Sequence, residues 1–216
     1  MGIYLARCSH SLRERAVTCA FGKDWKSSSI PGPGPVKKGT DQHMDQKQVI
    51  KQMDEMLLVR YGCSMTTASP QQMYRALCYV VNGMLASKSA EFHRKNQGKQ
   101  VYYMSMEFLV GTSLRNTLYN LGLEDVFAKA LDKCGVDIHD LYEIEPDAGL
   151  GNGGLGRLAS CYMDSAASLD LPMTGYSIRY EFGIFKQKIV DGWQVEFPDD
   201  WLSMGDVCLV PHEAEA

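Results

Sequence analysis

Five glycines crowd into the eight residues from Gly149 to Gly156, and this cluster restricts what the surrounding chain can form. Glycine has no Cβ, so a ligand or another backbone segment can come close to the exposed N–H groups. A helical apolar pattern follows from Arg157 onward, so the glycines stand directly before a helix, whose positive N-terminal end favours phosphate or another anion. The sequence therefore predicts an anion-binding turn at 149–156.

Other interpretations of the same cluster stay open on composition alone. The pattern Gly151-x-Gly153-x-x-Gly156 matches the dinucleotide fingerprint, which makes a nicotinamide or flavin enzyme an alternative. That fingerprint follows a strand, whereas residues 141–147 include three acids and a proline, which are poor strand formers. No Gly-Lys-Ser/Thr follows the glycines, which excludes a P-loop. A tight turn without a ligand is the remaining interpretation.

Residues 1–40 differ in charge from the rest of the chain. They contain seven Lys or Arg against two acids, whereas residues 41–216 contain 15 against 24. Alternating Pro and Gly within 27–40 neither pair as a strand nor continue a helix. We therefore expect a disordered basic tail over 1–40 and a folded domain over 41–216. The positive charges are scattered along the tail, so we expect no nucleic-acid binding.

Seven cysteines form no C-x-x-C pair and are odd in number, which argues against a disulfide framework and against a zinc site. A reducing compartment fits this pattern. No apolar run reaches the roughly 20 residues that cross a bilayer, so we expect no membrane span. These features predict a cytoplasmic protein. The alternative is an organelle, with residues 1–30 as a transit peptide, because they carry Arg and Ser and few acids.

Helical and strand patterns alternate along the body, which is typical of an α/β domain. Apolar residues at helical spacing over 49–57 predict a helix that ends at Gly62. A second helix is expected over about 70–92, begun by the capping box Ser69-Pro70-Gln71-Gln72. Asp191-Gly192 between two alternating runs predicts a β-hairpin. The other expected elements are a buried strand at 101–106, helices at 108–120, 124–134 and up to about 169, and a strand at 173–180.

The amino-acid sequences of several segments resemble those of the α-glucan (glycogen, starch or maltodextrin) phosphorylases. The resemblance runs from about residue 45 to 210 and keeps the order and spacing of five motifs. These are Val101–Gly111, Leu114–Leu118, Asp147–Ala159 with Asp164-Ser165, Gly175–Lys188, and Gly192-Trp-Gln with Pro198–Leu202.

The resemblance implies a GT-B glycosyltransferase fold, in which two Rossmann-like domains face each other across a cleft. It also implies pyridoxal phosphate on a lysine of the second domain, a homodimer, and cleavage of terminal α-1,4-glucan links by inorganic phosphate to give glucose 1-phosphate. The sequence ends before that domain and that lysine, so we expect a partial N-terminal domain with no complete catalytic set, inactive alone. The alternative is a non-catalytic fragment that binds glucan or pairs with a full-length subunit.

Particular residues fall in the family's motifs. Asn152, Gly153, Gly154 and Leu155 resemble the glycine loop whose amides face the sugar and phosphate. Glu107 resembles an acid near the sugar pocket; the alternative is a strand-end residue paired with an arginine.

Arg157 either neutralises phosphate or pairs with Asp147 or Glu145. Leu109 stands where animal members have a Tyr near the cofactor, and residues 84–94 lack a Trp, so we expect no animal-style activation. Six further motif residues are interpreted as packing or ion-pair residues: Asp164, Arg179, Glu181, Asp199, Asp200 and Trp201.

Overall fold

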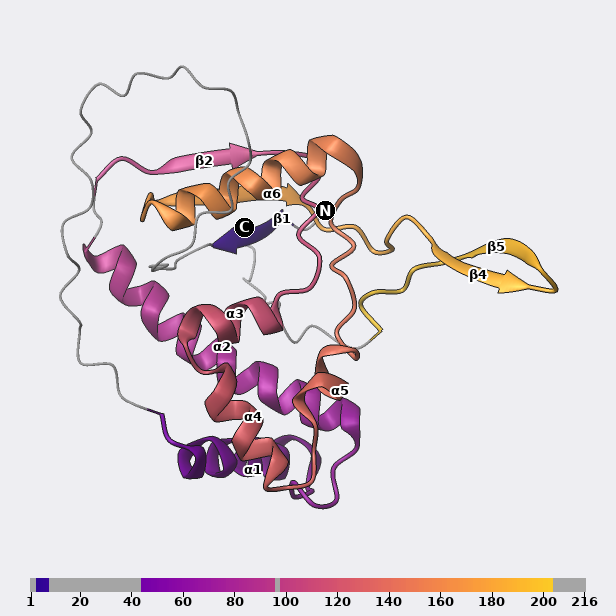
Figure 1. Ribbon diagram of the computed structural model, residues 1–216. Coiled ribbons are helices and arrows are strands. Elements are labelled where there is room, and N and C mark those ends of the chain that lie inside the picture. The colour runs from indigo at the N-terminus through magenta and orange to yellow at the C-terminus, as the bar shows by residue number, and fades with distance from the viewer. Residues whose placement is uncertain (1–2, 8–43, 96–97, 204–216) are drawn as a thin grey trace, which may run out of the picture.

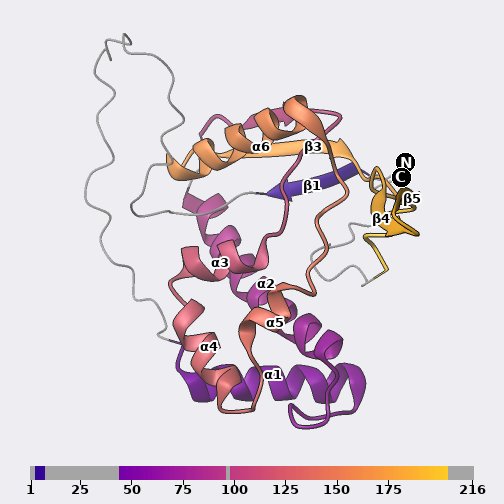
Figure 2. The ribbon, with the colours of Figure 1, turned by 45° about the vertical axis from the view of Figure 1, so that its right-hand side comes forward.

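The computed structural model of this chain describes residues 3–7, 44–95 and 98–203. A group of helices forms one part of the molecule, and a small sheet with one helix against it forms the other (Figure 1). A hairpin projects from the side of this body. Turning the molecule by 45° shows the same division between the helices and the sheet (Figure 2).

The helical part consists of α1 and α2 packed against three shorter helices. Its core includes the fully buried side chains of Met53, Leu57, Leu77 and Phe127. Burial of such large apolar groups is the main stabilising contribution to a domain of this size. The helix bounds are α1 Gln46–Tyr61, α2 Pro70–Lys95, α3 Leu114–Leu121, α4 Glu124–Asp132 and α5 Ile138–Tyr142.

The ends of the two long helices follow from their sequences. Helix α1 ends at Gly62, which adopts the left-handed conformation at φ 65°. Helix α2 begins with the predicted capping box: the Ser69 N–H donates to Gln72 Oε1 at 2.8 Å, and the Gln72 N–H donates to Ser69 Oγ at 3.3 Å. Both helix predictions are confirmed.

The sheet has the strand order β1-β3-β2 over β1 Ile3–Arg7, β2 Val101–Met104 and β3 Met173–Ile178. Strand β2 runs parallel to β3, and β1 runs antiparallel to it. Helix α6, Gly153–Ser168, lies beside β3, where Phe108, Ala159 and Met163 form a second small core. The mixture of helices and small sheets confirms the α/β class.

Three sequence predictions need correction. Residues 3–7 form β1 instead of part of a disordered tail, while residues 8–40 lie outside the described residues. The strand predicted to be buried is short and largely exposed, with Met104 81% accessible, because β2 is an edge strand of the described sheet. Helix α3 begins at Leu114 instead of near 108, because residues 107–109 run extended beside the glycines.

The predicted hairpin is confirmed. Strands β4 Lys186–Val190 and β5 Trp193–Phe197 pair antiparallel, with Val190 opposite Trp193. Asp191 and Gly192 both have positive φ, 52° and 81°, as a two-residue type I′ turn requires.

Candidate functional site

Three of the five loop glycines are required by close packing. A Cβ at Gly149 would overlap the indole ring of Trp201. A Cβ at Gly151 would lie 2.6 Å from the Phe108 backbone nitrogen, and one at Gly156 would lie 3.2 Å from that of Leu109. The contacts at Gly149 and Gly151 are closer than real Cβ atoms come, and the one at Gly156 is tighter than most, so these glycines let the loop lie close to its neighbours.

Two backbone hydrogen bonds hold the loop in this position. The Phe108 N–H donates to the Leu150 carbonyl at 3.0 Å, and the Leu109 N–H donates to the Gly156 carbonyl at 3.0 Å. The segment 107–109 therefore runs along the loop and fixes both of its ends. This leaves the middle of the loop, Asn152–Leu155, free to face solvent.

The middle of the loop forms the open N-terminus of α6. Asn152 is the N-cap residue but makes no side-chain capping bond, and the N–H groups of Gly153, Gly154 and Leu155 have no acceptor among the described residues. All four residues are exposed. Gly153 has φ 64°, which only glycine adopts without strain, whereas a Cβ at Gly154 would meet open space. Convergent unpaired donors at a helix N-terminus are suited to an anion.

Glu107 is half-buried beside this loop. Its N–H donates to the Ser105 hydroxyl at 3.2 Å, and that hydroxyl donates to the Glu107 carbonyl at 2.8 Å. Its carboxylate has no hydrogen bond or ion pair within the described part of the chain, so no arginine pair is found there. The free carboxylate of Glu107 and the unpaired N–H groups at the N-terminus of α6 therefore offer a ligand both a hydrogen-bond acceptor and several donors.

Arg157 makes neither of the ion pairs considered from the sequence. Its guanidinium donates instead to the Leu109 carbonyl at 3.4 Å. It also lowers the pKa of Asp164, although burial has the larger and opposite effect, so the pKa of Asp164 is raised overall. Leu109 is half-buried and contributes its backbone to holding Gly156.

Asp164→Asn tests the pKa of Asp164. A folded-state pKa above the unfolded value means that the bound proton stabilises the fold fully below the unfolded pKa, and that this stabilisation is lost as pH rises through the folded pKa. Asparagine does not titrate, so we expect the variant to lose less stability than the wild type between about pH 3 and pH 7. Urea unfolding at several pH values measures this, and parallel stability curves would contradict it.

Glu145 joins the segment before the loop to the start of α3. Its carboxylate accepts from the Ser113 N–H at 2.7 Å, the Ser113 hydroxyl at 3.0 Å and the Leu114 N–H at 3.0 Å. A carboxylate at a helix N-terminus satisfies unpaired N–H groups and interacts with the helix dipole. Sequence inspection missed this role, because the two partners are far apart in the chain.

We expect Glu145→Ala to lower the free energy of unfolding by about 2 kcal/mol, because several hydrogen bonds to one charged group are lost together. Chemical denaturation measures the change. Glu143→Ala is the matched control, since Glu143 is exposed and its carboxylate has no partner in the described structure. Equal stability of the two variants would refute the capping role.

Two of the other motif residues, Trp201 and Asp199, make contacts within the fold. The Trp201 indole N–H donates to the Tyr180 carbonyl at 3.2 Å, and the Tyr180 hydroxyl donates to the Met106 carbonyl at 3.0 Å. Asp199 lies 3.9 Å from Lys186 in an ion pair. Trp201 and Asp199 are thus a packing and an ion-pair residue, as predicted.

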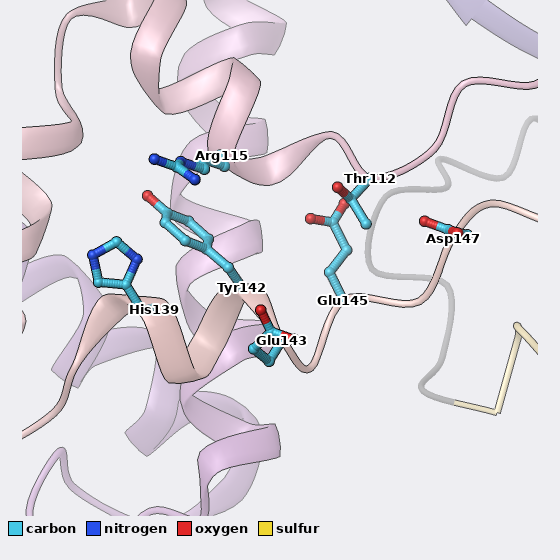
Figure 3. Close-up of a pocket in the computed structure, with 7 residues that line it drawn as sticks. All are labelled: Thr112, Arg115, His139, Tyr142, Glu143, Glu145 and Asp147. Atoms are coloured by element: carbon cyan, nitrogen blue, oxygen red, sulfur yellow. The ribbon is translucent and has the colours of Figure 1, made fainter.

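A separate polar pocket of about 440 Å³ lies at α3 and α5 (Figure 3). It is lined by Thr112, Arg115, His139, Tyr142, Glu143, Glu145 and Asp147. Within the described ranges, no group of three or more His, Cys, Asp or Glu side chains is placed to hold a metal ion. None of the described helices combines the length and apolar character of a membrane span.

Comparison with known proteins finds similarity to one family. The family model described as "Carbohydrate phosphorylase" matches residues 131–216, which include the glycine loop and α6. The human brain form of glycogen phosphorylase is 49% identical over 142 residues, or 64% of this chain and 17% of the relative. Glycogen phosphorylase of Chlamydia pneumoniae is 51% identical over 143 residues, or 65% and 17%.

These similarities support a segment of an α-glucan phosphorylase. The bovine liver form of glycogen phosphorylase is also similar, at 49% identity over 142 residues. The phosphorylase segment described here spans 17% of the length of these relatives. The predicted family is confirmed, and the dinucleotide enzyme is not supported.

Proposed function

We propose that this chain forms one wall of the active site of an enzyme that cleaves terminal α-1,4-glucosidic links with inorganic phosphate and releases glucose 1-phosphate. The observation that carries the proposal is the open N-terminus of α6, where three adjacent N–H groups have no acceptor in the described structure. The similarity to glycogen phosphorylases over this segment supports the choice of reaction.

The N–H groups of Gly153, Gly154 and Leu155 donate to phosphate oxygens in this proposal. They are fixed before any ligand arrives, because the packing glycines and the segment 107–109 hold the loop. Preorganised donors aimed at developing negative charge are among the strongest contributors to enzymatic rate. Asn152 sits at the same helix end with its side chain uncommitted as a cap.

Glu107 and Arg157 complete this wall. The free carboxylate of Glu107 accepts hydrogen bonds from sugar hydroxyls and lies close to positive charge that develops on the sugar ring. Arg157 adds a positive charge near the loop, held by the Leu109 carbonyl. Leu109 contributes the backbone bond that positions Gly156.

The donor set fits a phosphate group of pyridoxal phosphate or of the substrate, and not an aldehyde. Residues 107–111 and 149–157 contain no lysine, so an amine that holds the cofactor has to come from elsewhere. When bound, the cofactor supplies a phosphate that exchanges a proton with the substrate phosphate.

We further propose that this chain forms part of a Rossmann-like domain in a GT-B arrangement. We also propose that the whole enzyme is a homodimer and lies in the cytoplasm.

A chimera tests the function. The matching segment of the human brain form is replaced by this phosphorylase segment, and glucose 1-phosphate release from glycogen and phosphate is measured. We expect release by the chimera and none by the 216-residue chain alone, because this chain supplies only one wall of the proposed site. A folded, cofactor-loaded chimera without activity would rule out the proposal, and turnover by the chain alone would show that one wall is enough.

A further inference from the structure

The pocket at α3 and α5 contains a buried hydroxyl group without a partner. The Tyr142 hydroxyl is closed to solvent and has no hydrogen bond within the described residues. Burial and the charge of Glu124 raise the pKa of Tyr142 to about 12 against the opposing effect of Arg115, so the phenol keeps its proton and acts as a donor. A buried donor without an acceptor is costly and calls for a ligand or water that is missing from the fold itself.

The exposed side chain of Arg115 lies beside this hydroxyl. In Figure 3 the hydroxyl points toward the guanidinium of Arg115, whose central carbon lies 5.8 Å from the Tyr142 ring centre. Arg115 is 65% exposed and is held by an ion pair to Glu124 at 3.3 Å. Glu124 is 27% exposed, but the arginine end of the pair faces solvent, so a rotation of Arg115 away from the phenol costs little.

The other lining groups bring both donors and acceptors. Thr112, Glu143 and Asp147 have no side-chain hydrogen bond within the described structure, and His139 makes only an edge contact with Tyr142 at 5.8 Å between ring centres. Glu145 already occupies the N-terminus of α3. The pocket thus presents hydroxyl, imidazole and guanidinium donors beside uncommitted carboxylate acceptors, around one aromatic ring.

This mixture selects the class of ligand. The three carboxylates that line the pocket, those of Glu143, Glu145 and Asp147, repel an anion. A cation could not accept hydrogen bonds from the phenol and guanidinium donors. A neutral polyhydroxyl compound satisfies both sets, because each sugar hydroxyl donates to a carboxylate and accepts from a phenol or guanidinium. The volume of about 440 Å³ lies in the range of small-molecule sites.

We propose that the pocket around Tyr142 is an accessory site for a sugar unit of an α-1,4-glucan, separate from the glycine loop. The choice of glucan over other polyols rests on the proposed function of the chain. An accessory site of this kind holds the polymer near the enzyme and raises the local concentration of chain ends.

The test is a titration of the whole 216-residue chain with maltoheptaose, in which binding is measured by calorimetry. We expect binding, and we expect Tyr142→Phe to weaken it about tenfold, as the loss of one buried hydrogen bond implies. The same variant should keep or gain thermal stability, because the unpaired hydroxyl is removed. Tyr119→Phe is the matched control, since Tyr119 is 65% exposed on α3 and does not line the pocket.

Absence of maltoheptaose binding, or binding that Tyr142→Phe leaves unchanged, would overturn the proposal. Glu143→Gln gives an independent check at an exposed position, where misfolding is not a concern, and should also weaken binding. Equal binding of cellohexaose would overturn the assignment to an α-1,4 linkage. Gly154→Ala should leave maltoheptaose binding intact, so failure of the glycine-loop function and failure of this site are separable.

Discussion

Gly151→Ala should abolish or severely weaken folding of the α6 region, with a loss of about 3 kcal/mol in the free energy of unfolding. The added Cβ would lie 2.6 and 2.8 Å from the backbone nitrogen and carbonyl carbon of Phe108. Backbone cannot turn aside as a flexible side chain can, and the Phe108 N–H is bonded to Leu150 at this point. Urea unfolding, followed by circular dichroism, measures the loss.

Gly154→Ala is the matched control for this experiment. It makes the same chemical change three residues away, but its Cβ would meet open space at an ordinary φ. We expect its stability to stay within about 0.5 kcal/mol of the wild type. If both alanine variants were equally stable, the close packing of Gly151 against Phe108 would be wrong.

The same Gly154→Ala change should lower turnover by about 10²-fold in the active chimera with the human brain form. Its Cβ would add bulk in open space at the N-terminus of α6, the helix end where phosphate oxygens are proposed to bind. The fold stays intact, so the loss reports on the ligand alone. Steady-state release of glucose 1-phosphate measures it.

Gly98→Ala serves as the control for turnover. Gly98 is also an exposed glycine with open space around its Cβ position, but it lies outside the loop, in the turn before β2. Its activity should match that of the unsubstituted chimera. Full activity of Gly154→Ala would argue against any role of these N–H groups in catalysis.

Local signals in the sequence were sufficient for several elements. The Ser69 capping box, Gly62 and the Asp191-Gly192 turn act through residues within a few positions of each other, so their patterns predict the structure directly. The short helix α5 was missed, although Asp137 caps it by accepting from the His139 N–H at 2.9 Å. That aspartate was an available signal.

The glycine loop illustrates what local patterns cannot provide. Spacing identified 149–156 as an anion-binding candidate, yet it treated the glycines as equivalent. Some of these glycines pack against Phe108 or Trp201 and others face open space, and both contact residues lie far from the loop in the sequence. The exposure of β2 is similar, since an apolar run gives no indication of whether a strand lies at the edge or the centre of a sheet.

The contact between Gly149 and Trp201 has an evolutionary consequence. A larger residue at position 149 collides with the indole, and a smaller residue at position 201 opens a void beside the loop. Neither position is free to drift while the other stays fixed. The two positions should therefore covary. A relative that has a larger residue at the position of Gly149 should have a smaller ring, or no ring, at the position of Trp201.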